Sequence, residues 1–219
     1  MNKFKIVFFD CDGVLLFGFP LTTLEQKLEI GLEITEKMGK YYKGEVTFQN
    51  FVDTIEILYK KSKLTKDLYE RIINFRNYEI NPEASDLIKY LKENKYKIAI
   101  ISSGSAEYVS GVADYFGIED FRVNTILEFN KDGEFEKLRG FGEDAQVKVD
   151  QLKEICDEMN IDPTETIFIG DSYNDQKAFR FTKHGILYRT ENPEFEKNTW
   201  MHVNDLRKVI KILEDANTN

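Results

Sequence analysis

Residues 5–15 read KIVFFDCDGVL, and the rest of the fold can be worked out from them. The apolar run at residues 6–9 shows no polar alternation, which is typical of a strand buried on both faces of a parallel sheet. Asp10 and Asp12 follow at once, so two carboxylates should emerge at the carboxyl end of that strand. Gly13 lets the chain turn sharply after them. In open parallel sheets this edge is where ligands bind.

Three further apolar runs continue the pattern, at residues 97–101, 166–169 and 185–188. Helical patterns lie between them, as crossovers between parallel strands require. The sequence therefore predicts an α/β fold, with a Rossmann-like parallel sheet and helices on both of its faces.

Start and stop signals mark several of these helices. Asn81 can cap a helix that begins with a proline, and Gly117 can end another helix that starts at Ser105. An apolar stripe at helical spacing covers residues 147–159. The run NKDG at residues 130–133, between two short apolar runs, predicts a β-hairpin.

The stretch between the first two strands has a different character. Thr22 and Glu25 have the spacing of a capping box, and further helices should begin at Thr47 and Thr65. Residues 22–77 contain no run typical of a buried strand. This part of the chain is therefore predicted to be helical.

We expect these helices to form an all-helical cap, residues 17–79, inserted into an α/β core formed by residues 1–16 and 80–219. Such a block would lie over the carboxyl edge of the sheet, where the ligand site is expected. No linker or low-complexity tract separates the two parts. Cap and core should therefore form one compact unit.

The composition excludes several classes of partner. With 30 basic and 39 acidic residues the net charge is -9, and no basic cluster is visible, so nucleic acid is not an expected partner. No stretch approaches the roughly 20 apolar residues of a membrane helix, and the first apolar run is too short for a secretory signal. Cys11 and Cys156 form no disulfide or zinc pattern, which favours a reducing compartment and a cytoplasmic protein.

Asp10 and Asp12 are placed for nucleophilic and acid–base chemistry. Asp10 could attack a phosphorus atom, and Asp12, adjacent across the turn, could protonate the leaving oxygen and later activate water. The alternative is that Asp-x-Asp is only a surface turn. Cys11, between the two aspartates, should point into the core.

Two later features could bind phosphate. Ser102, Ser103 and Gly104 close the second strand and open a helix, so that hydroxyl and main-chain N–H groups are available to an anion. Alternatively, these residues merely cap the helix. Lys148 lies on the helix before the third strand and could neutralise phosphate and Asp10, although a solvated lysine is the ordinary alternative.

A second acidic pair follows the third strand, in the run GDSYND at residues 170–175. Asp171 and Asp175 should lie at the same sheet edge as Asp10 and Asp12, and four converging carboxylates would repel one another without a cation. Oxygen-only ligation is typical of Mg²⁺ rather than Zn²⁺. The alternative is a turn in which these residues serve conformation alone.

Taken in order, D-x-D-G-x-L, a strand ending in serine, a lysine and G-D-x3-D resemble the motifs of the haloacid dehalogenase superfamily over about residues 5–190. The helical insert resembles that of its phosphoserine phosphatase-like branch. The resemblance implies that Asp10 is the nucleophile and that Asp12 is the general acid and base. It also implies that Asp10, Asp171 and the main-chain carbonyl of Asp12 bind Mg²⁺.

The same resemblance assigns roles around the phosphoryl group. Ser102 would hold it with help from the N–H groups of Ser103 and Gly104, and Asn174 would reach the same site. Lys148 would balance the charge of the nucleophile and the phosphoryl group. Asp175 would orient that lysine or the surroundings of the metal.

These features predict a Mg²⁺-dependent phosphatase that hydrolyses a small phosphorylated metabolite through an aspartyl-phosphate on Asp10. Asp12 favours hydrolysis or mutase chemistry, because dehalogenases lack this aspartate and cation-pumping ATPases carry threonine there. Two alternatives stay open, a phosphotransferase or mutase that uses the same intermediate and a non-catalytic binding protein on the same fold. The sequence says nothing about oligomeric state.

The cap sequence bears on the substrate. Residues 43–48, KGEVTF, resemble the phosphoserine phosphatase cap and align its phenylalanine with Phe48. Phe19 and Ile55 stand where those enzymes place a glutamate for the substrate amine and an arginine for its carboxylate. An aliphatic side chain cannot replace an arginine fork. We therefore expect Phe19, Phe48 and Ile55 to line an apolar pocket, and free phosphoserine to be a poor substrate.

Overall fold

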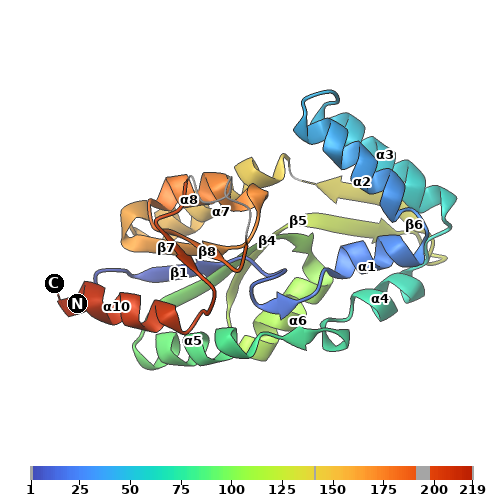
Figure 1. Cartoon of the computed structure of the whole chain (residues 1–219). Coiled ribbons are helices and arrows are strands. Elements are labelled where there is room, and N and C mark those ends of the chain that lie inside the picture. Colours follow the sequence, from blue (N-terminus) through green and yellow to red (C-terminus); the bar gives the residue numbers. More distant parts are fainter. Residues whose placement is uncertain (1, 141, 191–197, 219) are drawn as a thin grey trace.

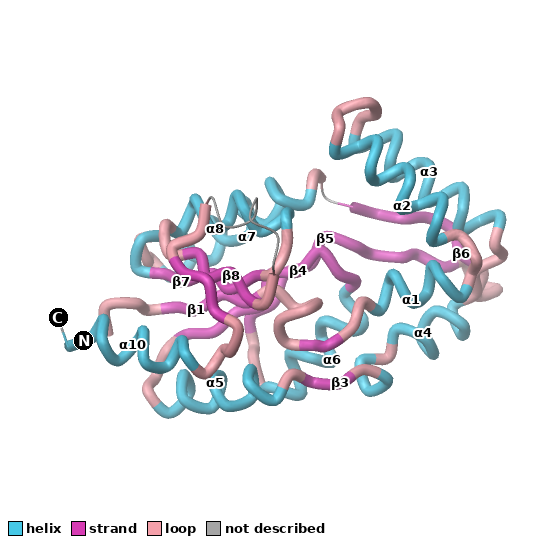
Figure 2. Tube along the Cα trace, viewed as in Figure 1, coloured by secondary structure: helices cyan, strands magenta, loops and turns pink. Residues whose placement is uncertain are grey.

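The computed structural model describes residues 2–140, 142–190 and 198–218. Within that part of the chain a seven-stranded sheet runs through the centre of the molecule, in the order β6-β5-β4-β1-β7-β8-β9 (Figures 1 and 2). Its strands are β1 (Ile6–Phe9), β4 (Lys97–Ser105), β5 (Asp120–Phe129), β6 (Phe135–Gly140), β7 (Thr166–Gly170), β8 (Gly185–Tyr188) and β9 (Met201–Val203). All neighbours are parallel except β5 and β6. The predicted α/β fold class is confirmed.

Strand β1 is the centre of the sheet, with β4 on one side and β7 on the other. Val7 and Phe9 contribute to one hydrophobic cluster, whereas Ile6 and Phe8 contribute to the other. All four side chains are fully buried, which explains the unbroken apolar run in the sequence.

Helices cover both faces of the sheet, as predicted (Figure 1). On the face of Val7 and Phe9 lie α5 (Pro82–Glu93), α6 (Ala106–Phe116) and α10 (Lys208–Thr218). On the other face lie α7 (Asp144–Met159) and α8 (Gln176–Thr182). No helix among the described residues is long and apolar enough to cross a membrane.

Most of the helix ends predicted from the sequence are present in the structure. Asn81 caps α5 by accepting a hydrogen bond from the Glu83 N–H, and Gly117 ends α6 in the left-handed region with φ of 57°. Helix α7 begins three residues earlier than its apolar stripe indicates. The reason is that the Glu143 side chain caps it by accepting from the Gln146 N–H.

The predicted hairpin exists, but it is part of the main sheet. Strand β5 pairs in parallel with β4 from Asp120 to Thr125 before it turns at Gly133 and pairs with β6. The first half of β5 reads DFRVNT and has no apolar run, and its side chains are only partly buried except for the buried Asn124. The sequence pattern therefore showed the turn and missed half of the strand.

Between residues 17 and 79 the chain forms four described α-helices, α1 (Pro20–Lys27), α2 (Gly31–Tyr42), α3 (Phe48–Lys61) and α4 (Lys66–Ile73). Thr47 and Thr65 cap α3 and α4, as predicted. The predicted start at Thr22 is wrong, because Pro20 occupies the first turn of α1, where proline is favoured. The chain also breaks at Glu29, whose φ is 61°, so α1 and α2 are separate helices.

The helical segment is joined to the sheet by a small two-stranded antiparallel sheet that the sequence did not predict. Strand β2 (Leu16–Phe17) leads out and β3 (Glu79–Ile80) leads back. Asn81 holds both ends, because its main-chain N–H donates to the Leu15 carbonyl (2.9 Å) and its side-chain amide donates to the Val14 carbonyl (2.7 Å).

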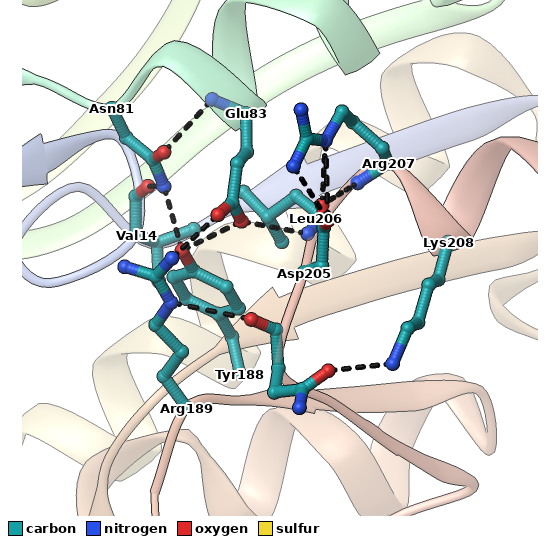
Figure 3. Close-up of polar contacts among 10 residues, drawn as sticks. Val14, Asn81, Glu83, Tyr188, Arg189, Asp205, Leu206, Arg207 and Lys208 are labelled. Carbon is teal, nitrogen blue, oxygen red and sulfur yellow. Dashed lines mark hydrogen bonds and ion pairs between the residues drawn. The ribbon is translucent and has the colours of Figure 1, made fainter.

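A buried carboxylate fastens this junction to the C-terminal part of the chain (Figure 3). Glu83 accepts hydrogen bonds from the Tyr188 hydroxyl (3.0 Å) and the Leu206 N–H (3.0 Å), and it also pairs with Arg189. Glu83 is 8% exposed, so its acceptors are matched to donors within the protein.

In Figure 1 the helices α1–α4 lie together at the end of the molecule away from the termini, with α2 and α3 beside β6. Helix α3 is tied to β6 by a hydrogen bond from the Leu138 N–H to Glu56 (3.1 Å), and Phe135 N–H donates to the Leu64 carbonyl (2.9 Å). We propose that residues 17–79 are the cap predicted from the sequence, with residues 1–16 and 80–219 as the core. The β5–β6 hairpin then belongs to the core and contacts the cap through α3 and the start of α4.

Candidate active site

The carboxyl ends of three neighbouring strands bring together the polar residues predicted to act on phosphate. Strand β1 pairs with β4 and β7 through Phe9, opposite Ile100 and Ile169. The next residue, Asp10, is 5% exposed and its N–H donates to the Ile169 carbonyl (2.8 Å). The strand register therefore places Asp10 beside the loops that follow β4 and β7.

Lys148 reaches this point from α7. Its ammonium lies 2.9 Å from Asp10 Oδ2 and 2.6 Å from Asp175 Oδ1, and its side chain is 1% exposed. Burial alone would lower the pKa of Lys148, but the carboxylates of Asp10 and Asp175 outweigh it and raise that pKa above its ordinary value. Lys148 is therefore a fixed positive charge beside Asp10, not a solvated surface lysine.

Asp175 is fully buried, and both of its carboxylate oxygens face hydrogen-bond donors of the protein. One oxygen faces Lys148, and the other accepts from the N–H groups of Asp171 (3.0 Å) and Ser172 (3.1 Å). A side chain at Gly170 would lie 2.4 Å from this carboxylate, which explains the glycine. Asp175 thus positions both Lys148 and the loop that carries Asp171.

The carboxylate of Asp171 points at the turn after β1, where a side chain on Gly13 would lie 2.1 Å from Asp171 Oδ2. Carboxylate oxygens of Asp10, Asp171 and Asp175 all lie within 4.8 Å of one another. Asp12 contributes a buried oxygen, Oδ1, that has no hydrogen-bond partner in the part of the chain that the structure describes. The acidic residues predicted from separate motifs therefore meet in one place.

Electrostatics favour a cation among these groups. Burial, and after it the charge of Asp10, raises the pKa of Asp12 to about 7. Burial also raises the pKa of Asp10, against the opposing effect of Lys148, and burial and the neighbouring aspartates raise that of Asp171. Each carboxylate is thus less stable in its charged form than in water. An oxygen-only donor set of this kind fits Mg²⁺, with Asp10 and Asp171 as the side chains available to hold it.

The loop after β4 forms a second wall. Ser102 is 1% exposed and its hydroxyl oxygen accepts from the Gly104 N–H (3.0 Å), while the Ser103 hydroxyl oxygen accepts from the Asn174 amide (3.1 Å). A side chain at Gly104 would lie 1.8 Å from the Tyr108 hydroxyl, so only glycine fits. Hydroxyl and N–H groups therefore surround the place where Asp10 emerges.

Residues 4–180 match the haloacid dehalogenase-like hydrolase family. The chain belongs to that family. Its curated relatives include the phosphoserine phosphatases of Streptococcus thermophilus, 25% identical over 99% of both chains, and of Methanocaldococcus jannaschii, 24% identical over 97% of this chain and 99% of that one. It also resembles the phosphoserine phosphatase of Archaeoglobus fulgidus at 23% identity, and there it spans only 53% of the relative's length.

Solved structures support the fold of this hydrolase. A phospho-aspartyl intermediate analogue of phosphoserine phosphatase superposes with a TM-score of 0.80 at 21% identity, covering 96% of this chain and 99% of that one. A substrate-bound phosphoserine phosphatase complex gives the same score, covering 97% and 99%. The chain thus shares its fold with these phosphoserine phosphatases, which its helical insert also resembles.

One residue of the site gave no signal in the sequence. Tyr108, on α6, is 1% exposed, and its hydroxyl donates to Asp12 Oδ2 (2.7 Å). It reaches Asp12 only because Gly104 leaves room for its ring. In the sequence it is one apolar position on an amphipathic helix. The buried environment of Cys11, by contrast, is as predicted.

A cavity of about 370 Å³ lies over this site and is lined by both cap and core. Phe48 and Ile55 line it, as predicted. Phe19 does not, and that prediction is wrong: it is 52% exposed at the residue preceding α1, because Pro20 starts the helix there and directs the chain away. The alignment with the phosphoserine phosphatase cap, made without gaps, did not predict that the helix starts this early.

Glu25 lines the cavity instead. Its sequence spacing from Thr22 indicated only a capping box, which the structure does not form. Burial raises the pKa of Glu25 to about 7, and the Tyr59 hydroxyl, at 3.4 Å, opposes this only in part. The cap thus carries an acidic residue into the space above Asp12.

Proposed function

We propose that this hydrolase is a Mg²⁺-dependent phosphatase that acts on a small phosphate monoester through an aspartyl-phosphate on Asp10. The observation that carries the proposal is the buried contact of Asp10 with Lys148 (2.9 Å) at the edge where Ser102 and Asp171 also lie. The relatives named as phosphoserine phosphatases support the same class of reaction. The buried, unpaired cysteines are compatible with the reducing, cytoplasmic setting expected from the sequence.

In the first half-reaction, an oxygen of Asp10 forms a bond to phosphorus while the bond from phosphorus to the ester oxygen breaks. Asp12 gives its proton to that leaving oxygen. Burial and the charge of Asp10 raise the pKa of Asp12, which favours its protonated form, and its Oδ1 has no hydrogen-bond partner among the described residues. The Tyr108 hydroxyl on Oδ2 holds the group in place.

In the second half-reaction, Asp12 takes a proton from a water molecule as that water attacks phosphorus. The bond to Asp10 then breaks, and free phosphate leaves. Mg²⁺, held by Asp10, Asp171 and the main-chain carbonyl of Asp12, would supply positive charge to the phosphoryl oxygens. Lys148 balances the remaining charge on Asp10, and Ser102, Gly104 and Asn174 orient the phosphoryl group.

The proposal extends to the substrate, because we expect free phosphoserine to be used poorly. No arginine or lysine is found among the described residues that line the cavity, so none is available for the carboxylate of phosphoserine. Ile55 and Phe48 present apolar surface instead. A phosphate ester without a carboxylate suits such a cavity better.

A phosphate-release screen over small phosphate esters, with Mg²⁺ and with EDTA, tests this function. We expect Mg²⁺-dependent release that Asp10→Asn abolishes, and a kcat/KM for phosphoserine below that of other esters. Added acceptor alcohol would reveal a phosphotransferase, because the phosphate would then appear on the alcohol. Undiminished release by Asp10→Asn would exclude the proposed nucleophile.

A further inference from the structure

The cavity over Asp12 is lined by charges of one sign. Glu25 enters from α1, and Glu143 and Asp144 enter from the start of α7. Among the described residues that line it there is no lysine, arginine or histidine. Lys148 is 1% exposed and contacts Asp10 and Asp175, so two carboxylates outside this lining already share its charge.

The three carboxylates differ in the cations and hydrogen-bond donors that lie beside them. Glu143 pairs with Lys177 (2.8 Å), and Asp144 accepts from the Asn124 amide. The Glu25 carboxylate accepts only from the Tyr59 hydroxyl, at 3.4 Å, as far as the described residues go. A partly buried carboxylate without a cation is unfavourable, and Glu25 is the one of these three that has neither a cation nor a close hydrogen-bond donor among the described residues.

Aromatic rings surround the same space. Tyr41 stacks on Phe51 with ring centres 5.6 Å apart, and Phe48 meets Tyr41 edge-on at 6.0 Å. Tyr42 from the cap meets Tyr173 from the core at 5.5 Å, so the ring cluster extends across both parts of the protein. All five rings line the cavity. Ring faces attract cations, most strongly where water is excluded.

We propose that the leaving group is a cationic amino alcohol without a carboxylate, carrying a primary or quaternary ammonium that Glu25 and the aromatic rings bind. This rests on the phosphatase function proposed above and names its substrate class. The bond that breaks is the same one, from phosphorus to the ester oxygen, and the alcohol leaves with the proton from Asp12. The cavity volume of about 370 Å³ is suited to a small metabolite of this kind.

The same lining also rejects the wrong ligand. A carboxylate next to the ammonium, as in phosphoserine, would enter a cavity that already holds Glu25, Glu143 and Asp144. Like charges brought together in a partly buried site disfavour binding strongly. Selectivity therefore comes from repulsion as well as attraction.

The test is a matched set of esters assayed with Mg²⁺: 2-aminoethyl phosphate, its trimethylammonium analogue, neutral propyl phosphate and phosphoserine. We expect kcat/KM for the two ammonium esters to exceed that for propyl phosphate by roughly ten- to hundredfold. In Glu25→Gln the ratio of 2-aminoethyl phosphate to propyl phosphate should fall by about tenfold. In Glu33→Gln, an exposed glutamate on α2, the ratio should stay at the wild-type value.

Two results would overturn the inference and leave the phosphatase intact: equal kcat/KM for the ammonium and propyl esters, or a Glu25→Gln ratio unchanged from wild type. A preference for phosphoserine would overturn it as well. Release of phosphate from none of the four esters, together with none in the wider screen, would remove the phosphatase function itself. Glutamine keeps the size of glutamate, and an unfolding curve for each variant separates misfolding from lost selectivity.

Discussion

Replacing Glu25 with glutamine should make the ligand-free protein more stable at pH 8, although it weakens the proposed substrate site. Burial raises the pKa of Glu25 from 4.5 to about 7. The folded protein therefore binds the Glu25 proton more tightly than the unfolded chain does. The stability contributed by this proton is fully present below pH 4.5 and is lost as the pH rises through about 7.

The size of the effect follows from the shift. A change from 4.5 to about 7 corresponds to about 3 kcal/mol, taking about 1.36 kcal/mol for each pKa unit. The side chain is only partly buried, so solvent screening reduces the expected gain to about 1–2 kcal/mol. Glutamine keeps an oxygen that can accept from the Tyr59 hydroxyl, so that contact is not lost.

Urea unfolding of the wild type and Glu25→Gln at pH 8 and at pH 4.5 measures this. We expect the variant to be more stable by about 1–2 kcal/mol at pH 8 and nearly equal at pH 4.5. Glu33→Gln, on an exposed position, should change little at either pH. If Glu25→Gln were less stable than wild type at pH 8, Glu25 would be a stabilising residue, and the reasoning about an unmatched carboxylate would be wrong.

Three further predictions concern other parts of the molecule. Glu83→Ala should lower the free energy of unfolding in urea by about 2–5 kcal/mol, because the Leu206 N–H, the Tyr188 hydroxyl and Arg189 lose the carboxylate they contact. The control Glu93→Ala, at an exposed position, should change it by almost nothing, and equal losses for the two variants would contradict this. Tyr108→Phe should lower kcat by about tenfold and the free energy of unfolding by about 1–3 kcal/mol, since it removes the hydroxyl that donates to Asp12; an unchanged kcat would show that this contact has no role in catalysis. EDTA should abolish turnover and Mg²⁺ should restore it, whereas turnover that survives EDTA would refute the assignment of the acidic cluster.

The parts of the fold that could be predicted are those with a simple periodic cause. Strands β1, β4 and β7 are buried on both faces, so their apolar runs were unmistakable, and their carboxyl ends then located Asp10 and Asp171. The order of the motifs was enough to propose Lys148 as a site residue, but only the structure shows that it is buried between two carboxylates.

The rest depended on contacts between distant segments. Tyr108 reaches Asp12 through the space left by Gly104, and a local sequence pattern does not predict such a contact between distant residues. Phe19 was assigned to the pocket by alignment with the phosphoserine phosphatase cap, and that alignment did not predict the early start of α1 at Pro20. Glu25 matched a capping pattern, yet its position on the inner side of α1 makes it part of the cavity.

The most direct test is to locate the covalent intermediate. The protein is mixed with Mg²⁺ and 2-aminoethyl phosphate or another turned-over ester, quenched in acid within one turnover, and digested for mass spectrometry. We expect a peptide heavier by one phosphoryl group, with that group on Asp10, and its absence from Asp10→Asn. A phosphoryl group on another residue, or steady phosphate release with no labelled peptide at any quench time, would contradict the account.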